Sequence, residues 1–238
     1  MPSSTLEHDI AGKNYQHFIA HAATEDVKSV ILIAPTWAGR DNFVCDKATE
    51  LAQHGYTSLA LDLYGDAAVG VSNEENTSLM TPLISDRDQL QALLTEILHT
   101  ISKQAFAKDM PILAIGYCFG GLCVLDMARV GLPLAGVVSI HGLMTPPENL
   151  EIQAITSPIL ALHGYQDPMV PPEQLHAFNQ EMLKAEANWE VCVYGQARHA
   201  FTNPIANDHE LGTVYHQQTS QRAWNRMLNF IADCVSSE

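Results

Sequence analysis

The sequence is short of basic residues, and this shortage argues against one large class of partner. Only 12 lysines and arginines stand against 27 aspartates and glutamates in 238 residues, so the formal net charge is −15 at pH 7. A surface this acidic repels the phosphates of nucleic acids and the headgroups of anionic lipids. We therefore expect neither a nucleic acid nor a membrane as partner.

Long apolar runs and a recognisable targeting segment are also lacking. No run approaches the ~18 apolar residues that a membrane span requires. The first nine residues, M-P-S-S-T-L-E-H-D, have neither the basic region nor the apolar core of a signal peptide. We expect a cytoplasmic protein.

Cysteine is sparse and does not form a framework. The five cysteines are odd in number and have no C-x-x-C spacing, which is typical of reduced thiols: Cys45, Cys118, Cys123, Cys192 and Cys234. His209 and His216 are spaced to share a helix face, but no third ligand stands near them in the sequence. We expect no metal site.

What the chain does have is a regular alternation of apolar runs and amphipathic segments. Apolar runs predict strands over 29–34, 56–61, 112–115, 134–140 and 159–162, an alternating pattern predicts a strand over 189–194, and a weaker alternation over 15–20 predicts an edge strand. Helical spacing covers 41–53, 84–106, 122–130, 173–187 and 219–235. This order predicts an α/β fold with a mostly parallel central sheet and helices on both faces.

One domain accommodates the whole chain, residues 1–238, because α/β folds of this length commonly stay single. Neither a linker nor an internal repeat interrupts it. Residues 66–83 carry glycine, asparagine, serine, glutamate and proline with little periodicity, and they predict a long loop near the active site.

The most informative stretch is Ile112–Leu125, I-L-A-I-G-Y-C-F-G-G-L-C-V-L. A buried strand, a turn flanked by glycines and an immediate helix are typical of a nucleophile elbow, here with Cys118 at the position of the nucleophile. A helix N-terminus beside the sulfur would favour a thiolate. The alternative is a buried cysteine in a tight turn between a strand and a helix.

Two loops downstream hold the partners that such a nucleophile needs. Asp167 follows the strand 159–162, and His199 follows the strand 189–194. Because the carboxyl ends of parallel strands meet at one edge of a sheet, these side chains are expected to lie near Cys118. The order nucleophile, acid, histidine is also the order found in α/β-hydrolases.

Each of these residue types has a chemical role in acyl transfer. His199 would take a proton from the Cys118 thiol and return it to the leaving group, and Asp167 would orient the imidazole. The backbone N–H of Phe119 is the expected oxyanion donor, and a second donor is assigned to Trp37 in the loop after the strand 29–34.

Simpler interpretations remain open for single residues. Asp167 beside Pro168 is also typical of a turn or a helix cap. His141 and His163 each follow a strand and precede a glycine, and we expect both to pack in turns rather than to react.

The motifs together resemble those of the dienelactone hydrolase family, the cysteine branch of the α/β-hydrolases. The matching segments are G-Y-C-F-G-G (116–121), H-G-Y-Q-D-P-M-V-P (163–171), R-H-A-F-T-N-P (198–204), L-D-L-Y-G-D (61–66) and S-D-R-D-Q-L (85–90). The resemblance covers roughly residues 15–235. It implies a triad of Cys118, Asp167 and His199 that hydrolyses small esters, lactones or thioesters without a cofactor, through a thioacyl-enzyme.

The resemblance also directs attention to the substrate pocket. Thr36 stands where well-studied members have a glutamate that partners the resting cysteine, and Arg87 and Arg198 are the available partners for a substrate carboxylate. Tyr117 and Phe201 complete the expected contacts of a small ester or lactone. We expect a monomer or a small homo-oligomer.

Two other functions remain in competition with hydrolysis. Cys118 would also suit a thiol-based redox sensor or a non-catalytic binding protein. The complete set of Asp167 and His199 favours hydrolysis, because a sensor needs a thiolate but no proton shuttle.

Overall fold

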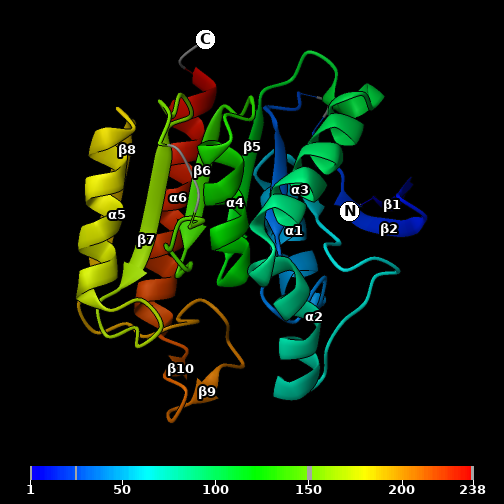
Figure 1. Cartoon of the computed structure of the whole chain (residues 1–238). Helices are drawn as coiled ribbons and strands as arrows, with labels where there is room; N and C mark the ends of the chain where they lie inside the picture. Colours follow the sequence, from blue (N-terminus) through cyan, green and yellow to red (C-terminus); the bar gives the residue numbers. More distant parts are fainter. Residues whose placement is uncertain (1, 25, 149–151, 237–238) are drawn as a thin grey trace. The chain divides into compact units, whose positions relative to one another are not determined.

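The computed structural model describes residues 2–24, 26–148 and 152–236, and its contacts divide the chain into two compact units, Met1–Ile115 and Gly116–Glu238. Figure 1 shows strands and helices alternating along each of them. The first unit contains β1 (Ser3–Ile10), β2 (Lys13–Ala20), β3 (Val30–Ala34), α1 (Asn42–Gln53), β4 (Thr57–Ala60), α2 (Asn73–Ser85), α3 (Arg87–Ser102) and a 3₁₀ turn (Ala105–Ala107). Strand β5 (Ile112–Tyr117) carries the chain into the second unit.

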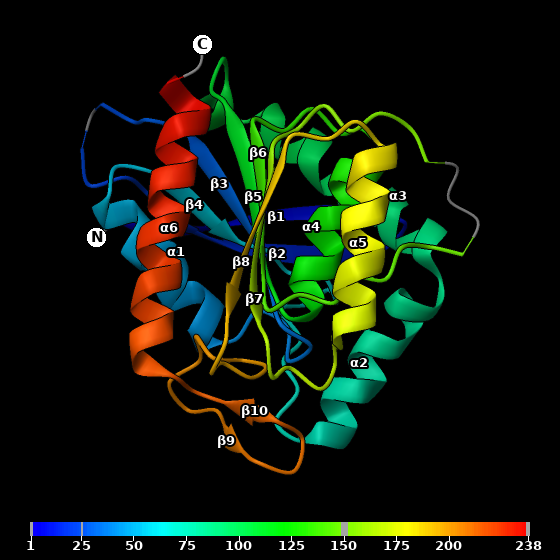
Figure 2. The same ribbon diagram turned by 90° about the vertical axis from the view of Figure 1, so that its left-hand side faces the viewer.

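Strands of the first unit pair in the order β1-β2-β4-β3. The pairing of β3 with β4 is parallel, and Val30 lies opposite Thr57. All residues of β3 and β4 are buried, and β3 has the continuous apolar run that predicts a strand buried on both faces. Helices α1 and α3 lie on opposite faces of these strands (Figure 2).

The strand predicted over 15–20 exists, but its predicted position at the sheet edge is wrong. It forms the last six residues of β2, which pairs antiparallel with β4 on one side and with β1 on the other. Strand β1 is almost entirely polar and exposed, so its sequence has no buried face to reveal it. It is held by its hairpin with β2, in which Ser3 lies opposite Ala20.

The prediction that 66–83 is a loop is also wrong, because most of this segment lies in α2. A reciprocal capping box starts the helix: the Ser72 hydroxyl accepts the Glu75 N–H, and the Glu75 carboxylate accepts the Val71 N–H. This S-x-x-E spacing was the available signal. The helix buries only Asn76 and Leu83, so it has no apolar stripe.

Helix α3 confirms the helical spacing predicted within 84–106. Its buried residues are the six that the period of 3.6 selects: Leu90, Leu93, Leu94, Ile97, Leu98 and Ile101. The Asp86 carboxylate caps its first turn by accepting the Gln89 N–H.

The second unit contains α4 (Phe119–Arg129), β6 (Gly136–Ile140), β7 (Ile159–Gly164), α5 (Pro172–Lys184), β8 (Trp189–Tyr194), the short strands β9 (Asn207–Asp208) and β10 (Thr213–Val214), and α6 (Gln217–Ser236). Strands β6, β7 and β8 are neighbours and run parallel. Helices α4 and α5 lie on one face of these strands and α6 lies on the other (Figure 2). The carboxyl ends of three parallel strands therefore meet at one edge.

A buried ionic network joins the two helices on the first of these faces. The Arg129 guanidinium of α4 donates to both carboxylate oxygens of Glu181 on α5, at 2.7 and 2.9 Å, and to Asp126 at 3.1 Å. Each group satisfies the charge of another, which is the condition under which buried charges are tolerated.

No helix within the described ranges is both long and apolar enough to cross a membrane.

Two histidines in the first unit make its stability depend on pH. Buried His17 accepts the Asp62 N–H on Nδ1 at 3.0 Å, so its proton lies on Nε2, which is 2.8 Å from His8 Nε2. Burial, with smaller effects of the charges of His8 and Arg40, lowers the pKa of His17 to about 3. The unfolded chain binds this proton near pH 6.5, so the stability that neutral His17 contributes is lost as the pH falls from about 6.5 towards 3.

We expect the variant His17→Gln to be less stable at pH 7 and to lose less stability than the wild type between pH 6.5 and 4.5. Urea denaturation at several pH values measures this difference. The exposed His54 provides the matched control His54→Gln, which should keep the slope of the wild type. Identical slopes for wild type and His17→Gln would contradict the assignment.

Candidate active site

Cys118 occupies the sharp turn between β5 and α4. Its backbone has φ 56° and ψ −116°, outside the regions that L-residues favour, and it is the N-cap residue of α4. Its N–H donates to the Ile140 carbonyl at the end of β6, and its carbonyl accepts the Gly121 N–H at 2.9 Å. Its side chain is partly exposed. The predicted elbow geometry is therefore present, with the sulfur at the helix N-terminus.

Glycines are required around this turn because backbone atoms approach one another closely. A Cβ on Gly116 would lie 1.9 Å from the Gly120 carbonyl oxygen, and a Cβ on Gly121 would lie 2.5 Å from the Cα of Gly142. Both of these atoms belong to the main chain, which cannot rotate away as a flexible side chain can. The glycines thus allow the helix to start immediately after the strand.

Asp167 lies in the loop after β7 and has both carboxylate oxygens engaged. One accepts the Met169 N–H at 2.8 Å, and the other lies 2.7 Å from Nδ1 of His199. The side chain is buried. Asp167 therefore stabilises its own turn and also orients a histidine, so the two interpretations of this residue are compatible.

His199 follows β8, and its surroundings fix both its backbone and its ring. Its carbonyl accepts the Val214 N–H at 2.9 Å, and its ring Nδ1 is held by Asp167. The Nε2 atom is buried.

The protonation of His199 depends on two neighbours. Burial lowers its pKa, but the negative charge of a Cys118 thiolate and the hydrogen bond and charge of Asp167 outweigh burial and raise the pKa to about 10. His199 therefore holds a proton at neutral pH when Cys118 is a thiolate. The three side chains form an electrostatic unit.

The loop that contains Asp167 also lies close to the loop that contains His199. A Cβ on Gly164 would lie 2.7 Å from the Ala197 carbonyl oxygen, and the Gln166 N–H donates to that same carbonyl at 3.0 Å. The lack of a side chain at Gly164 lets the loop of Asp167 lie against the segment that precedes His199.

Phe119 is the first residue of α4, directly after Cys118, as an oxyanion donor requires. Tyr117 and Phe201 are buried, and the Phe201 ring packs against His141 and Tyr194 at centroid distances of 5.2 and 5.6 Å. Both remain predicted substrate contacts. Arg198 lies beside the site in sequence, and its guanidinium reaches the His209 carbonyl at 3.5 Å.

The remaining predicted site residues belong to the first unit. The Thr36 hydroxyl accepts the Ala38 N–H at 3.3 Å, and the Trp37 carbonyl accepts the Tyr64 hydroxyl at 3.0 Å. Arg87 is the first residue of α3. Their roles towards Cys118 stay predictions.

The sequence did not identify His141 as part of the site. Its ring lies edge to face with that of His199, with centroids 5.2 Å apart, and its Nε2 lies 2.8 Å from the Thr202 hydroxyl. The only available signal was its position after a strand, which it shares with His163.

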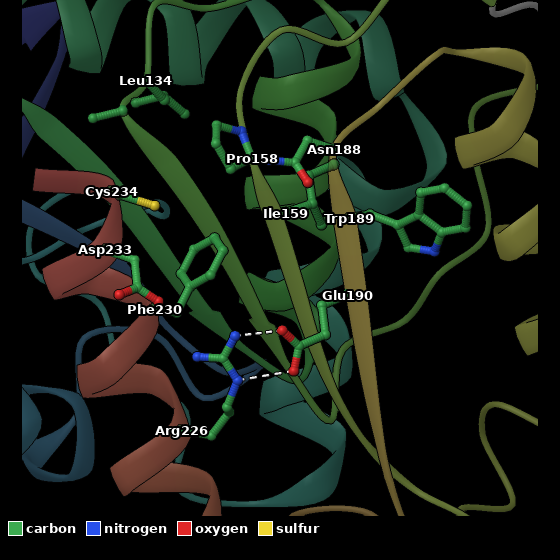
Figure 3. Close-up of a pocket in the computed structure, with 11 residues that line it drawn as sticks. Leu134, Pro158, Ile159, Asn188, Trp189, Glu190, Arg226, Phe230, Asp233 and Cys234 are labelled. Atoms are coloured by element: carbon green, nitrogen blue, oxygen red, sulfur yellow. Dashed lines mark hydrogen bonds and ion pairs between the residues drawn. The ribbon is translucent and has the colours of Figure 1, made fainter. Parts of the chain in front are cut away.

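A cavity of about 580 Å³ also lies in the second unit, away from these residues. Figure 3 shows that the Arg226 guanidinium pairs there with both carboxylate oxygens of Glu190. Its lining includes Leu134, Ile159 and Trp189, at or before the first residues of β6, β7 and β8. Cys118, Asp167 and His199 follow the last residues of β5, β7 and β8, so the cavity lies at the opposite ends of the strands.

Comparison with solved structures shows the same fold in a known enzyme. A dienelactone hydrolase-like promiscuous phosphotriesterase from metagenomic libraries is 26% identical, with a TM-score of 0.92 over 98% of both chains. This likeness confirms the predicted class, an α/β-hydrolase fold with a mostly parallel sheet.

Curated relatives agree with this likeness. A Bradyrhizobium protein provisionally named 2-oxo-3-(5-oxofuran-2-ylidene)propanoate lactonase is 25% identical over 92% of this chain and 90% of its own. A Yersinia pestis protein provisionally named carboxymethylenebutenolidase is 27% identical over 84% of this chain and 76% of its own. The model of the dienelactone hydrolase family matches residues 18–235. The chain therefore belongs to the dienelactone hydrolase family.

Proposed function

We propose that this protein hydrolyses small esters or lactones through a covalent thioacyl-enzyme, with Cys118 as nucleophile, His199 as acid and base, and Asp167 as the group that orients His199. Membership of the family supports a hydrolase of esters or lactones. The observation that carries the finer proposal is the buried 2.7 Å contact between Asp167 and His199, together with the effect of the Cys118 charge on the pKa of His199.

The proposed reaction has two halves. The Cys118 thiolate attacks the carbonyl carbon, and the carbonyl π electrons move to the oxygen. As that oxyanion collapses, the bond to the leaving oxygen breaks, and the leaving oxygen takes the proton of the His199 imidazolium. In a lactone the released alcohol stays attached to the acyl group.

The second half regenerates the enzyme. Neutral His199 takes a proton from water as the water oxygen attacks the thioester carbon. Collapse of this intermediate expels the Cys118 thiolate and leaves a carboxylic acid, so the imidazolium and the thiolate are restored. Asp167 keeps Nδ1 protonated throughout, so that Nε2 exchanges the proton.

Stabilisation of the oxyanion is assigned to two backbone N–H groups. Phe119 follows the nucleophile at the first position of α4, where the helix dipole favours negative charge. Trp37 of the first unit is the proposed second donor.

The names of the relatives indicate a lactone as the substrate class, since one names a lactonase and the other a carboxymethylenebutenolidase. Thr36, Tyr117 and Phe201 are the proposed pocket residues, and Arg87 and Arg198 are proposed to hold a substrate carboxylate. A thioester is a further substrate that this chemistry permits. We further propose a cytoplasmic monomer or small homo-oligomer that needs no cofactor.

The first test is the mass of the intact protein after brief exposure to p-nitrophenyl acetate, with nitrophenol release followed over time. We expect an acetyl adduct on Cys118 that turns over in the wild type. Cys118→Ala should give no adduct there, and His199→Ala should slow nitrophenol release by at least about a hundredfold, because the proton shuttle is lost.

Cys234→Ser is the matched control, because burial, aided by the charge of Asp233, raises the pKa of Cys234 to about 11 and makes it a poor nucleophile at neutral pH. It should retain wild-type turnover. A stable adduct, or none on Cys118, would contradict the hydrolase mechanism. Peroxide oxidation of Cys118 without turnover would instead favour the redox sensor.

A second prediction concerns Asp167→Asn, which keeps an oxygen for the Met169 N–H but removes the negative charge beside His199. We expect kcat to fall by about 10²–10⁴ because the imidazole loses its tautomer and its charge partner. Burial lowers the pKa of His199, but the charge of Cys118 together with the hydrogen bond and charge of Asp167 raises it to about 10 in the wild type, so removal of the Asp167 charge should lower it. The activity loss at high pH should therefore begin at a lower pH in the variant.

The pH dependence of kcat between pH 6 and 10.5 measures both effects, with thermal unfolding as a check on the fold. A variant that retains more than half of the wild-type kcat and the same high-pH limb would refute the role of Asp167.

A further inference from the structure

His141 lies directly after β6, at the edge of the strands where Cys118, Asp167 and His199 also follow their strands. Its backbone has φ 38°, in the left-handed region, and its side chain is only 1% exposed. A histidine in this conformation is uncommon, and its burial shows that the ring is part of the packed interior.

Four groups surround the His141 ring. Its Nε2 lies 2.8 Å from the Thr202 hydroxyl. The ring centroids of His199 and Phe201 both lie 5.2 Å away, at interplanar angles of 63° and 79°, and that of Tyr117 lies 5.9 Å away. Edge-to-face geometry of this kind is the favourable arrangement for aromatic rings.

The end of β6 therefore contacts both reacting groups through consecutive residues. The Ile140 carbonyl accepts the Cys118 N–H at 3.1 Å, and the next residue, His141, packs against His199. Thr202 lies three residues after His199, so its bond to His141 also ties the loop of His199 to this strand end.

His141 is suited to lie beside an imidazolium because it remains neutral. Burial, and secondarily the charge of His199, lower the pKa of His141 well below 6.5, despite a smaller opposing hydrogen bond with its own backbone. Tyr117 and His199 are the titratable groups whose rings contact it within the described residues. A second cation here would repel the proton that His199 carries.

The contact with Asp167 does not by itself fix the His199 ring. The hydrogen bond at Nδ1 holds the ring at one atom, so the ring can still tilt by rotation about its Cα–Cβ and Cβ–Cγ bonds. A second ring packed at 63° removes that rotation. His199 then keeps Nε2 directed to one place during both proton transfers.

We propose that His141 is a positioning residue for His199, holding the imidazole by edge-to-face packing and the loop of His199 through Thr202. This inference rests on the proposed hydrolysis by Cys118. His163 offers a comparison within the unit, because it is equally buried but makes no ring contact with His199 among the residues that the structure describes.

The test uses two substitutions of His141 and two of Thr202, each assayed for nitrophenol release from p-nitrophenyl acetate. We expect His141→Ala to lower kcat roughly ten- to a hundredfold with KM within about twofold, because a misplaced base costs rate rather than binding. His141→Phe restores an aromatic ring and should recover most of the loss. Thr202→Val should lower kcat several-fold, and Thr202→Ser should have the kcat of the wild type.

The pH profile separates positioning from mere stability. A loosened His199 interacts less with the Cys118 thiolate, which raises its pKa in the wild type against the effect of burial. The high-pH limb of activity should therefore move to lower pH in His141→Ala. Thr219 is a threonine of the same unit buried to a similar degree, 5% exposed against 6% for Thr202, so Thr219→Val is the matched control. Thr219→Val should leave kcat and the high-pH limb of activity unchanged.

The proposal would be overturned if folded His141→Ala protein had the kcat and the high-pH limb of the wild type. It would also be overturned if Thr219→Val lowered kcat as much as Thr202→Val does.

Alkylation of Cys118 by iodoacetamide across the same pH range keeps the test independent of hydrolysis. If the wild type does not turn over the ester, the proposed function fails. A shift in the pH dependence of alkylation in His141→Ala would still support positioning of His199, and no shift would refute it.

Discussion

The site depends on a backbone conformation at Cys118 that an L-residue adopts only under constraint. A residue held at φ 56° and ψ −116° costs of order 1–3 kcal/mol, so the surroundings must maintain it. Buried β5 fixes one side of the turn and buried α4 fixes the other. The contact between Gly121 and Gly142 then sets the helix against the segment after β6. Packing thus maintains the exposed sulfur in a position that local preference would not give.

The charges of the site are stabilised by one another rather than by water. His199 is buried, which lowers its pKa, and the charge of an ionised Cys118 together with the hydrogen bond and charge of Asp167 raises it. Desolvation strengthens both attractions, since their energy rises as the local dielectric falls. The same burial keeps His141 neutral beside the charged ring. The pKa values of two histidines in contact are therefore shifted in opposite directions, upward for His199 and downward for His141, and the difference arises from their partners.

In the second unit, the two ends of the strands carry different functional groups. Cys118, His141, Asp167 and His199 all lie at or beyond carboxyl ends, where loops can be shaped without disturbing the sheet. The opposite ends border the cavity with the paired Arg226 and Glu190. Hydrogen bonds between Arg129 and Glu181 join α4 to α5 on one face of these strands.

The sequence by itself determined the strands of the sheet other than β1, the amphipathic helix α3 and the elbow at Cys118, because burial on one or two faces leaves a periodic pattern and a tight turn requires glycine. It also predicted that Cys118, Asp167 and His199 lie near one another, since the carboxyl ends of parallel strands meet at one edge of a sheet. Only the tertiary structure decided the interior place of β2, the pairing of β1 beside it and the contact of His141 with His199 and Thr202. These features rest on pairings between distant residues and on side-chain direction, which the local pattern of a sequence does not record.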